Sequence, residues 1–78
     1  MSRYEARYEG EWVKPSPEDE ERGRANQPVD HHKYWDLALH NVLLKVEDGD
    51  EGPFDVHRKI HVKHSSPGWV DGYRVDLS

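Results

Sequence analysis

The 78-residue sequence contains no cysteine. Disulfide bonds and thiolate metal sites are therefore excluded, which fits a reducing compartment such as the cytoplasm. No apolar run approaches the roughly 20 residues that a membrane-spanning helix needs, and residues 1–6 do not have the composition of a signal peptide. We therefore expect a cytoplasmic protein without membrane contacts.

The chain is too short for a second domain, so we treat residues 1–78 as a single domain. A domain of this size buries only about 60% of the surface that its unfolded chain exposes, and its stability is marginal without further support. Because disulfides are excluded, the remaining sources of stability are self-association and a bound ligand. We predict a homo-oligomer.

Basic residues are in the minority, with 11 Lys and Arg against 16 Asp and Glu and a formal net charge of −5. A general nucleic-acid-binding domain carries a basic overall balance instead. The charge therefore argues against nucleic acid as a partner.

The clearest pattern lies in residues 56–77, where side chains alternate with a period of two on both sides of the turn-forming run at residues 65–68. This pattern predicts a β-hairpin. One face is apolar, with Val56 and Ile60 on the first arm and Tyr73 and Val75 on the second, and we expect it to be covered. The other face is basic and comprises His57, Lys59, His61, Lys63 and Arg74.

Asp71 falls in the apolar register of the second arm. Because Gly68 and Gly72 favour irregular backbone, we interpret Asp71 as a turn residue that precedes the strand. A partly buried carboxylate is the alternative interpretation.

Upstream of the hairpin, residues 4–13 alternate between aromatic or small side chains and charged ones, which predicts a first strand with an aromatic inner face. Residues 14–30 contain three prolines and an acidic run that leave little to bury. We expect these residues to form a mobile, acidic and proline-rich loop. Ser16 and Pro17 can start a short helical turn within it.

A helix is expected after this loop. Asp30 can cap its first amides, and Gly49 can end it. Apolar residues fall at helical spacing between them, namely Trp35, Leu39, Val42, Leu43 and Val46. The alternative is a strand over residues 37–46. The preferred order predicts an α+β fold, a small β-α-β-β domain whose three-stranded antiparallel sheet packs on one helix.

Two stretches of the sequence resemble the dodecin family. Residues 35–46, Trp-Asp-Leu-Ala-Leu-His-Asn-Val-Leu-Leu-Lys-Val, are similar to the dodecin helix, which has a Trp at its start and an Asn in the same place. Residues 73–77, Tyr-Arg-Val-Asp-Leu, resemble the closing strand of that family. The resemblance covers about residues 35–77, and the first strand by topology alone.

Dodecins are small, hollow homo-oligomers that bind flavins, so the resemblance implies flavin storage or sequestration, with FMN or riboflavin as the cofactor. The dodecin Trp that stacks on the flavin aligns with Pro53, and the Gln that binds the flavin edge aligns with Arg74. Our leading hypothesis is a non-enzymatic protein that binds a small aromatic ligand at subunit contacts. Its candidate ligand-binding residues are Trp35, Phe54, His61, Trp69 and Arg74.

Two alternatives remain open. One is a structural or protein-partner-binding module that uses residues 14–30 and the basic hairpin face. The other is an acid–base enzyme built on Asp71, Tyr73 and His40, although no phosphate loop, dinucleotide fingerprint or Ser–His–Asp arrangement is present. On a helix, His57, His61 and His64 would form a metal-binding face. On a regular strand His57 and His61 would lie about 13 Å apart and His64 would point to the opposite face, so we expect no metal site within one chain, and a site shared across an oligomer interface stays open.

Overall fold

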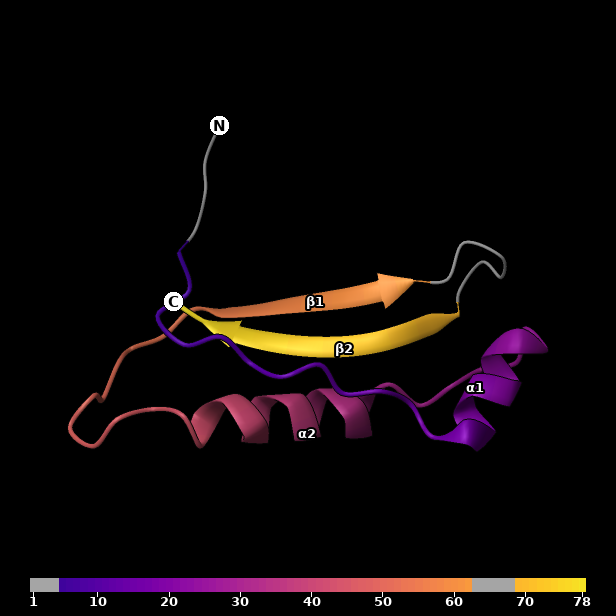
Figure 1. Cartoon of the computed structure of the whole chain (residues 1–78), viewed down its shortest axis with the longest axis horizontal. Helices are drawn as coiled ribbons and strands as arrows, with labels where there is room; N and C mark the ends of the chain where they lie inside the picture. The colour runs from indigo at the N-terminus through magenta and orange to yellow at the C-terminus, as the bar shows by residue number, and fades with distance from the viewer. Residues whose placement is uncertain (1–4, 63–68) are drawn as a thin grey trace.

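The computed structural model describes residues 5–62 and 69–78. Its elements, in order, are helix α1 (Pro17–Arg24), helix α2 (His32–Leu43), strand β1 (Val56–Val62) and strand β2 (Val70–Leu77). The two strands form an antiparallel hairpin, α2 packs beneath β2, and α1 lies at the end of the hairpin where β2 begins (Figure 1). Neither described helix has the length and hydrophobicity that a bilayer crossing requires.

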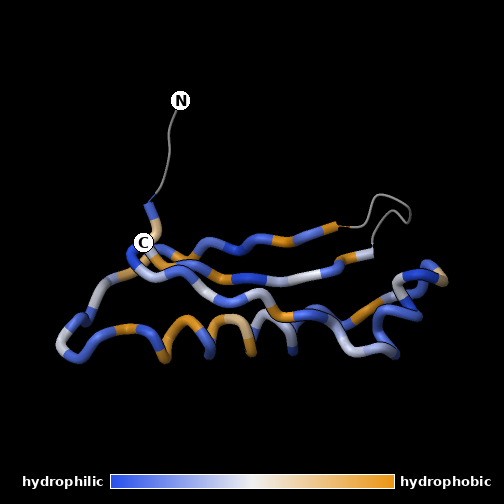
Figure 2. Tube along the Cα trace, in the orientation of Figure 1, coloured by the Kyte–Doolittle hydropathy of each residue, from blue (hydrophilic) through white to orange (hydrophobic). Residues whose placement is uncertain are grey.

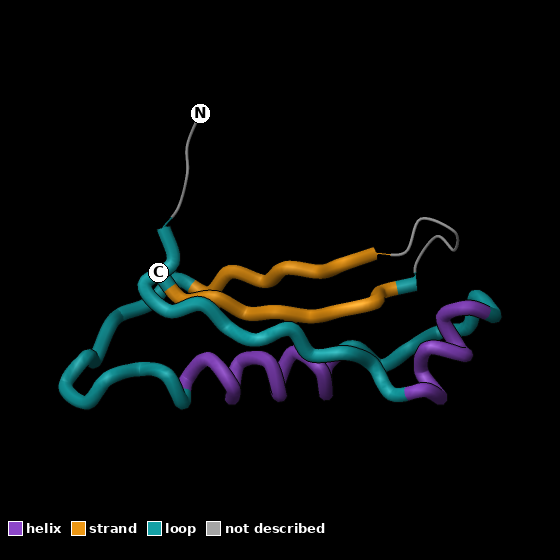
Figure 3. Tube along the Cα trace, viewed as in Figure 1, coloured by secondary structure: helices purple, strands orange, loops and turns teal. Residues whose placement is uncertain are grey.

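The predicted β-α-β-β domain with a three-stranded sheet on one helix is wrong, because the described elements follow the order α-α-β-β and the sheet has two strands. Residues 5–13, called the N-terminal segment below, run along β2 as a loop (Figure 3) and join it only at the isolated bridges Tyr8–Leu77 and Val13–Tyr73. The bridges lie five residues apart on this segment but four apart on β2. One extra residue therefore breaks the ladder. Tyr4, the first residue of the predicted strand, lies outside the described residues.

The hairpin itself is confirmed, with Val56 opposite Leu77 and Ile60 opposite Tyr73. Its predicted turn at residues 65–68, together with Lys63 and His64, lies outside the described residues. The register shifts near the open end, where His61 pairs with Gly72 and Val62 with Val70. Asp71 is therefore an extra residue within β2, a β-bulge, and its interpretation as a turn residue before the strand is wrong.

The predicted helix is also confirmed, and the alternative of a strand over residues 37–46 is wrong. The predicted cap is wrong, because the N-cap is His31, which makes no side-chain capping bond, and Asp30 accepts only the N–H of His32 at 3.0 Å. The regular helix ends at Leu43, ahead of Gly49, which has a φ of +89°.

Of the predicted apolar stripe only Val42 is buried, whereas Trp35, Leu39 and Val46 are partly buried and Leu43 is 50% exposed. The buried stripe is Tyr34, Ala38 and Val42, at helical spacing. This stripe packs against β2.

The predicted loop at residues 14–30 contains the eight-residue helix α1. Ser16 caps this helix by accepting the N–H of Asp19 at 3.2 Å, and Pro17 occupies the first turn, where its missing N–H has no consequence. Gly23 lies against the indole of Trp69, just ahead of β2. The helical turn expected at Ser16 and Pro17 is thus a longer element docked on β2.

The core of the described residues belongs to α2, β2 and the N-terminal segment, and none of it comes from β1. Its buried apolar residues are Val13, Tyr34, Ala38, Val42, Tyr73, Val75 and Leu77. Val56 and Ile60, which were expected to be covered, are 53% and 51% exposed. Hydrophobic and hydrophilic residues alternate along β1 (Figure 2), but α2 lies under β2 and leaves the apolar side of β1 open.

Candidate functional site

The face of the hairpin opposite α2, called the upper face below, carries a cavity of about 350 Å³. Five residues line it: Trp12, Lys14, His61, Asp71 and Gly72. The bridge between Val13 and Tyr73 fixes the N-terminal segment at this point. Val13 is buried in the core, and the side chain of its neighbour Trp12 is left 47% exposed beside the cavity. The cavity thus forms where the N-terminal segment meets the open end of the hairpin.

The β-bulge at Asp71 brings a carboxylate into this cavity. Asp71 Oδ2 lies 3.2 Å from Nδ1 of His61, the last β1 residue before the register shift. A carboxylate can only accept, so this hydrogen bond requires the proton on Nδ1 and leaves Nε2 of a neutral imidazole as an acceptor. The bulge therefore creates a carboxylate–imidazole pair that regular alternation would have kept apart.

Trp12 lies against the sheet because Gly72 has no side chain. A Cβ atom at Gly72 would be 3.2 Å from Cε3 of the indole, closer than ordinary van der Waals contact. The His61 ring meets the indole edge-on at 6.4 Å between centroids, and the Arg74 guanidinium lies 5.6 Å from the indole centroid. These contacts hold the indole in place while about half of it stays open to solvent.

A buried carboxylate neutralises much of the expected basic face. Asp76 is fully buried and accepts hydrogen bonds from Arg74 Nε at 2.8 Å and from the N–H of Gly10 at 2.9 Å. The Lys59 ammonium lies 3.1 Å from the same carboxylate. A buried charge is tolerated when it is paired in this way. Asp76 also fixes the guanidinium that contacts Trp12.

The structure brings only two of the five predicted ligand-binding residues, His61 and Arg74, to this site. Trp35 lies under the hairpin, edge-on to Tyr73 at 5.2 Å. Phe54 packs at the other end, 5.9 Å from Tyr8 and beneath Arg7. Trp69 contacts α1, with the Arg24 guanidinium 5.1 Å from its ring.

The predicted ligand-binding residues did not include Trp12, Lys14 and Gly72. The signal that could have found them is Gly72 inside a strand, since an internal glycine often marks a bulge or a close approach of another group.

The residues of the enzyme alternative are not brought together. Asp71 is on the upper face, His40 is exposed on α2, and Tyr73 is buried on the opposite side of the sheet. Burial raises the pKa of Tyr73 to about 12, and its hydroxyl is hydrogen-bonded to Nδ1 of His31. The described geometry offers these three groups no common substrate position.

The histidines of β1 engage separate partners. His57 Nε2 lies 2.6 Å from Oγ of Ser78, whereas His61 is held by Asp71. Over residues 5–62 and 69–78, no three His, Asp or Glu side chains are placed to share a metal ion. His64, the third histidine of the spacing considered above, lies outside the described residues.

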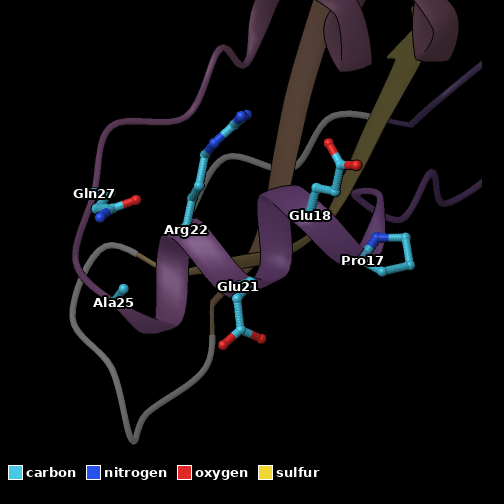
Figure 4. Close-up of a pocket in the computed structure, with 6 residues that line it drawn as sticks. All are labelled: Pro17, Glu18, Glu21, Arg22, Ala25 and Gln27. Carbon is cyan, nitrogen blue, oxygen red and sulfur yellow. The ribbon is translucent and has the colours of Figure 1, made fainter.

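A second and larger cavity, about 540 Å³, runs along α1 (Figure 4). It is lined by Pro17, Glu18, Glu21, Arg22, Ala25 and Gln27. The side chains do not converge: Glu21 points to one side of the helix, and Glu18 and Arg22 point to the other. Arg22 is also paired with Asp19 at 2.9 Å. The upper-face cavity is therefore the better candidate, because its polar groups surround an aromatic surface.

No protein-family model, curated protein or solved structure matches this chain.

Proposed function

We propose that this chain is a non-enzymatic binding protein that holds a flat aromatic ligand against Trp12 on the upper face of its hairpin. The observation that carries the proposal is the indole itself, which is fixed by Gly72 and Arg74 yet half exposed beside a cavity. An immobilised and open aromatic surface favours stacking of a second ring, because little conformational entropy is lost on binding.

The polar groups around Trp12 define the ligand further. Nε2 of neutral His61 and the Asp71 carboxylate present acceptors, and the Lys14 ammonium presents a donor, which suits a ring edge that carries both N–H and C=O groups. Lys14 adds a cation on the same cavity wall, which favours a ligand with an acidic substituent. The isoalloxazine ring of a flavin has such an edge, and FMN adds a phosphate.

Flavin binding is proposed here on Trp12 and its neighbours, and not on the positions that the dodecin resemblance implied. Pro53 is exposed in the loop before β1, and Arg74 is engaged by Asp76. Self-association stays a prediction, and measuring the mass of the protein in solution checks it.

The test is a titration of riboflavin and of FMN with the full-length protein, followed by flavin fluorescence and by calorimetry. We expect saturable quenching, with FMN binding roughly two- to fivefold more tightly than riboflavin, because a solvent-exposed charge pair contributes up to about 1 kcal/mol. The substitution Trp12→Ala should weaken binding about tenfold or more, since stacking on an aromatic side chain contributes about 1–3 kcal/mol.

Trp35→Phe is the matched control, because it changes a tryptophan on the opposite side of the sheet and should leave flavin binding unchanged. Equal affinity of Trp12→Ala and the unmodified protein would reject the proposed site. The absence of saturable quenching by either flavin would reject flavins as the ligand.

A further inference from the structure

The outer edge of β1 is open, and this observation is independent of the cavity at Trp12. The N-terminal segment lies along the far edge of β2, and within the part of the chain that the structure describes no strand pairs with β1 on its other side. The backbone pattern identifies the exposed groups. Asp55 and Ser78 exchange both hydrogen bonds, at 2.9 and 3.0 Å. In an antiparallel ladder the next residues alternate, so Val56, Arg58 and Ile60 direct their N–H and C=O groups away from β2.

The hydrogen bonds of β2 agree with this assignment. Leu77 and Tyr73, the partners of Val56 and Ile60, use their own backbone groups to bind Tyr8 and Val13. Three outward-facing residues of β1 thus form a template for another strand, which natural proteins usually cover or block.

An apolar surface adjoins this edge. The flank of α2 that carries Trp35, Leu39 and Leu43 lies beside β1, because the Arg58 guanidinium is 5.3 Å from the centre of the Trp35 ring. Leu43 is half exposed, as are Val56 and Ile60. We call the surface made by these six residues the β1 shelf: Val56, Arg58 and Ile60 on the strand, and Trp35, Leu39 and Leu43 on the helix.

The exposed side chains of the shelf are not part of the core. Leu43, Val56 and Ile60 are 50%, 53% and 51% exposed, so a partner can cover them without displacing the buried residues between α2 and β2.

The charge of β1 decides between a second copy and a different partner. The strand contains His57, Arg58, Lys59 and His61 and no acidic residue, in a chain of net charge −5. If two copies paired β1 with β1 in the fully overlapping antiparallel register, Lys59 would face Lys59 and His57 would face His61. A shift of two residues would bring Arg58 opposite Arg58. Like charges directly opposite each other destabilise a sheet.

We propose that the outer edge of β1 receives a strand from another protein, with side chains that alternate between acidic and apolar. Its backbone pairs with Val56, Arg58 and Ile60. Its acidic side chains lie on the face of His57, Lys59 and His61, where the Lys59 side chain stays 40% exposed although its ammonium contacts Asp76. Its apolar side chains extend over the β1 shelf, where the Arg58 guanidinium stays over the Trp35 ring. Backbone pairing supplies affinity in such strand addition, and the alternating side chains supply specificity.

The test uses two synthetic peptides with the full-length protein, one of alternating Glu and Val and one of alternating Lys and Val. We expect the Glu–Val peptide to bind and the Lys–Val peptide not to bind. Amide hydrogen exchange measured by NMR should slow at Val56, Arg58 and Ile60 when the Glu–Val peptide is added, because these N–H groups become hydrogen-bonded. The amides of His57 and Lys59 face β2 and should be protected with or without peptide.

Ile60→Glu should weaken Glu–Val binding about tenfold or more, by removing an apolar contact and adding a like charge. Leu44→Glu is the matched control, since Leu44 is exposed just after α2 and lies outside the shelf. Ile60→Pro is a second variant, which tests the backbone contact. It removes the outward N–H of residue 60 and leaves the hydrogen bonds between β1 and β2 in place.

Equal binding of both peptides, or unchanged exchange at the three outward amides, would overturn the proposal. Protection of the same amides by raising the protein concentration without peptide would assign the shelf to a second copy instead. Ile60→Glu should leave FMN binding unchanged, because the Ile60 side chain is on the face of the sheet opposite the Trp12 cavity. The failure of one proposal is therefore distinguishable from the failure of the other.

Discussion

The two strands of the hairpin have the same alternation in sequence, but β2 is buried in the structure and β1 is largely exposed. On β2, Tyr73 and Val75 are each 1% exposed, α2 lies beneath them, and the N-terminal segment lies along the edge. On β1, the residues of the same face are about half exposed and the outer edge is unpaired within the described chain. Alternation therefore determines which side chains share a face, whereas the neighbouring elements determine which strand is buried.

Arg58 gives a physical reason for this asymmetry. It lies between Val56 and Ile60 on the apolar side of β1, and no carboxylate among the described residues pairs with it. Its guanidinium reaches α2 only at the Trp35 ring, 5.3 Å away, and burying it fully beneath the helix would desolvate a charge that has no carboxylate partner there, which is costly. Tyr73, on the same face of β2, is an aromatic residue that packs well against the helix: it stacks on Tyr34 at 4.9 Å, and Trp35 meets it edge-on. The helix therefore packs under β2.

The largest difference in the free energy of unfolding should come from comparing a Val→Ala substitution on β2 with one on β1. Val75→Ala should lower the free energy of unfolding by about 2–3 kcal/mol, because two buried methyl groups are lost and a cavity remains. Val56→Ala, on the same face of β1, should cost less than about 1 kcal/mol, since its side chain is half exposed. Urea denaturation of both variants measures the difference. Equal losses would mean that β1 is covered in solution.

Gly10→Ala tests the cover along the edge of β2. A Cβ atom at this position would lie 2.0 Å from the carbonyl oxygen of Val75, so the N-terminal segment would have to move away. We expect a loss of roughly 1–2 kcal/mol, within the range seen for overpacked sites. Amide exchange should quicken at Leu77 and Tyr73, which donate to Tyr8 and Val13.

Glu5→Ala is the matched control for that substitution, because Glu5 is exposed on the same segment. It should change neither stability nor exchange. If Gly10→Ala left the Leu77 and Tyr73 amides protected, the segment would not be what protects that edge.

The sequence predicted the hairpin and the helix because both rest on periodicity. The period of two in residues 56–77 and the helical spacing of apolar residues from Trp35 to Val46 are local properties, and both elements form. The buried stripe of the helix was predicted less well, because it consists of Tyr34, Ala38 and Val42 and shares only Val42 with the predicted stripe. The third strand failed for a reason that periodicity does not contain. Residues 4–13 alternate well, but one extra residue between Tyr8 and Val13, together with the contact of Gly10 on Val75, prevents regular pairing.

The candidate site was less predictable than the fold. His61 and Arg74 were selected as basic residues on one face, and both are at the site. Their partners are not set by alternation: Asp71 reaches His61 through a bulge, and Trp12 arrives on a segment more than 45 residues away in sequence. Long-range placement of this kind follows from the packing of the whole chain.

The smallest of the three predicted losses of stability should appear only in acid. It concerns the end of β2 against which α1 packs. Asp19 is buried, with hydrogen bonds from Lys33 and the Tyr34 hydroxyl and from Arg22 at 2.9 Å. The Lys33 ammonium, followed by the Tyr34 hydroxyl, holds the pKa of Asp19 well below its ordinary value of 3.8, against the opposing effect of burial. The folded chain thus keeps this carboxylate ionised at a pH where the unfolded chain protonates it.

The sign of the pH dependence follows from this lowered pKa. Asp19 contributes its full stabilisation above about pH 3.8, and this is lost as the pH falls toward the lowered pKa of the folded state. Urea midpoints measured from neutral pH down to about pH 2 should therefore fall below pH 4, and Asp19→Asn should flatten that fall. Glu18→Gln, which removes an exposed carboxylate from the same helix, should keep it. Because Tyr34 joins Asp19 to Tyr73, acid should loosen β2 first at its α1 end, and an equal slope in both variants would exclude Asp19 as the cause.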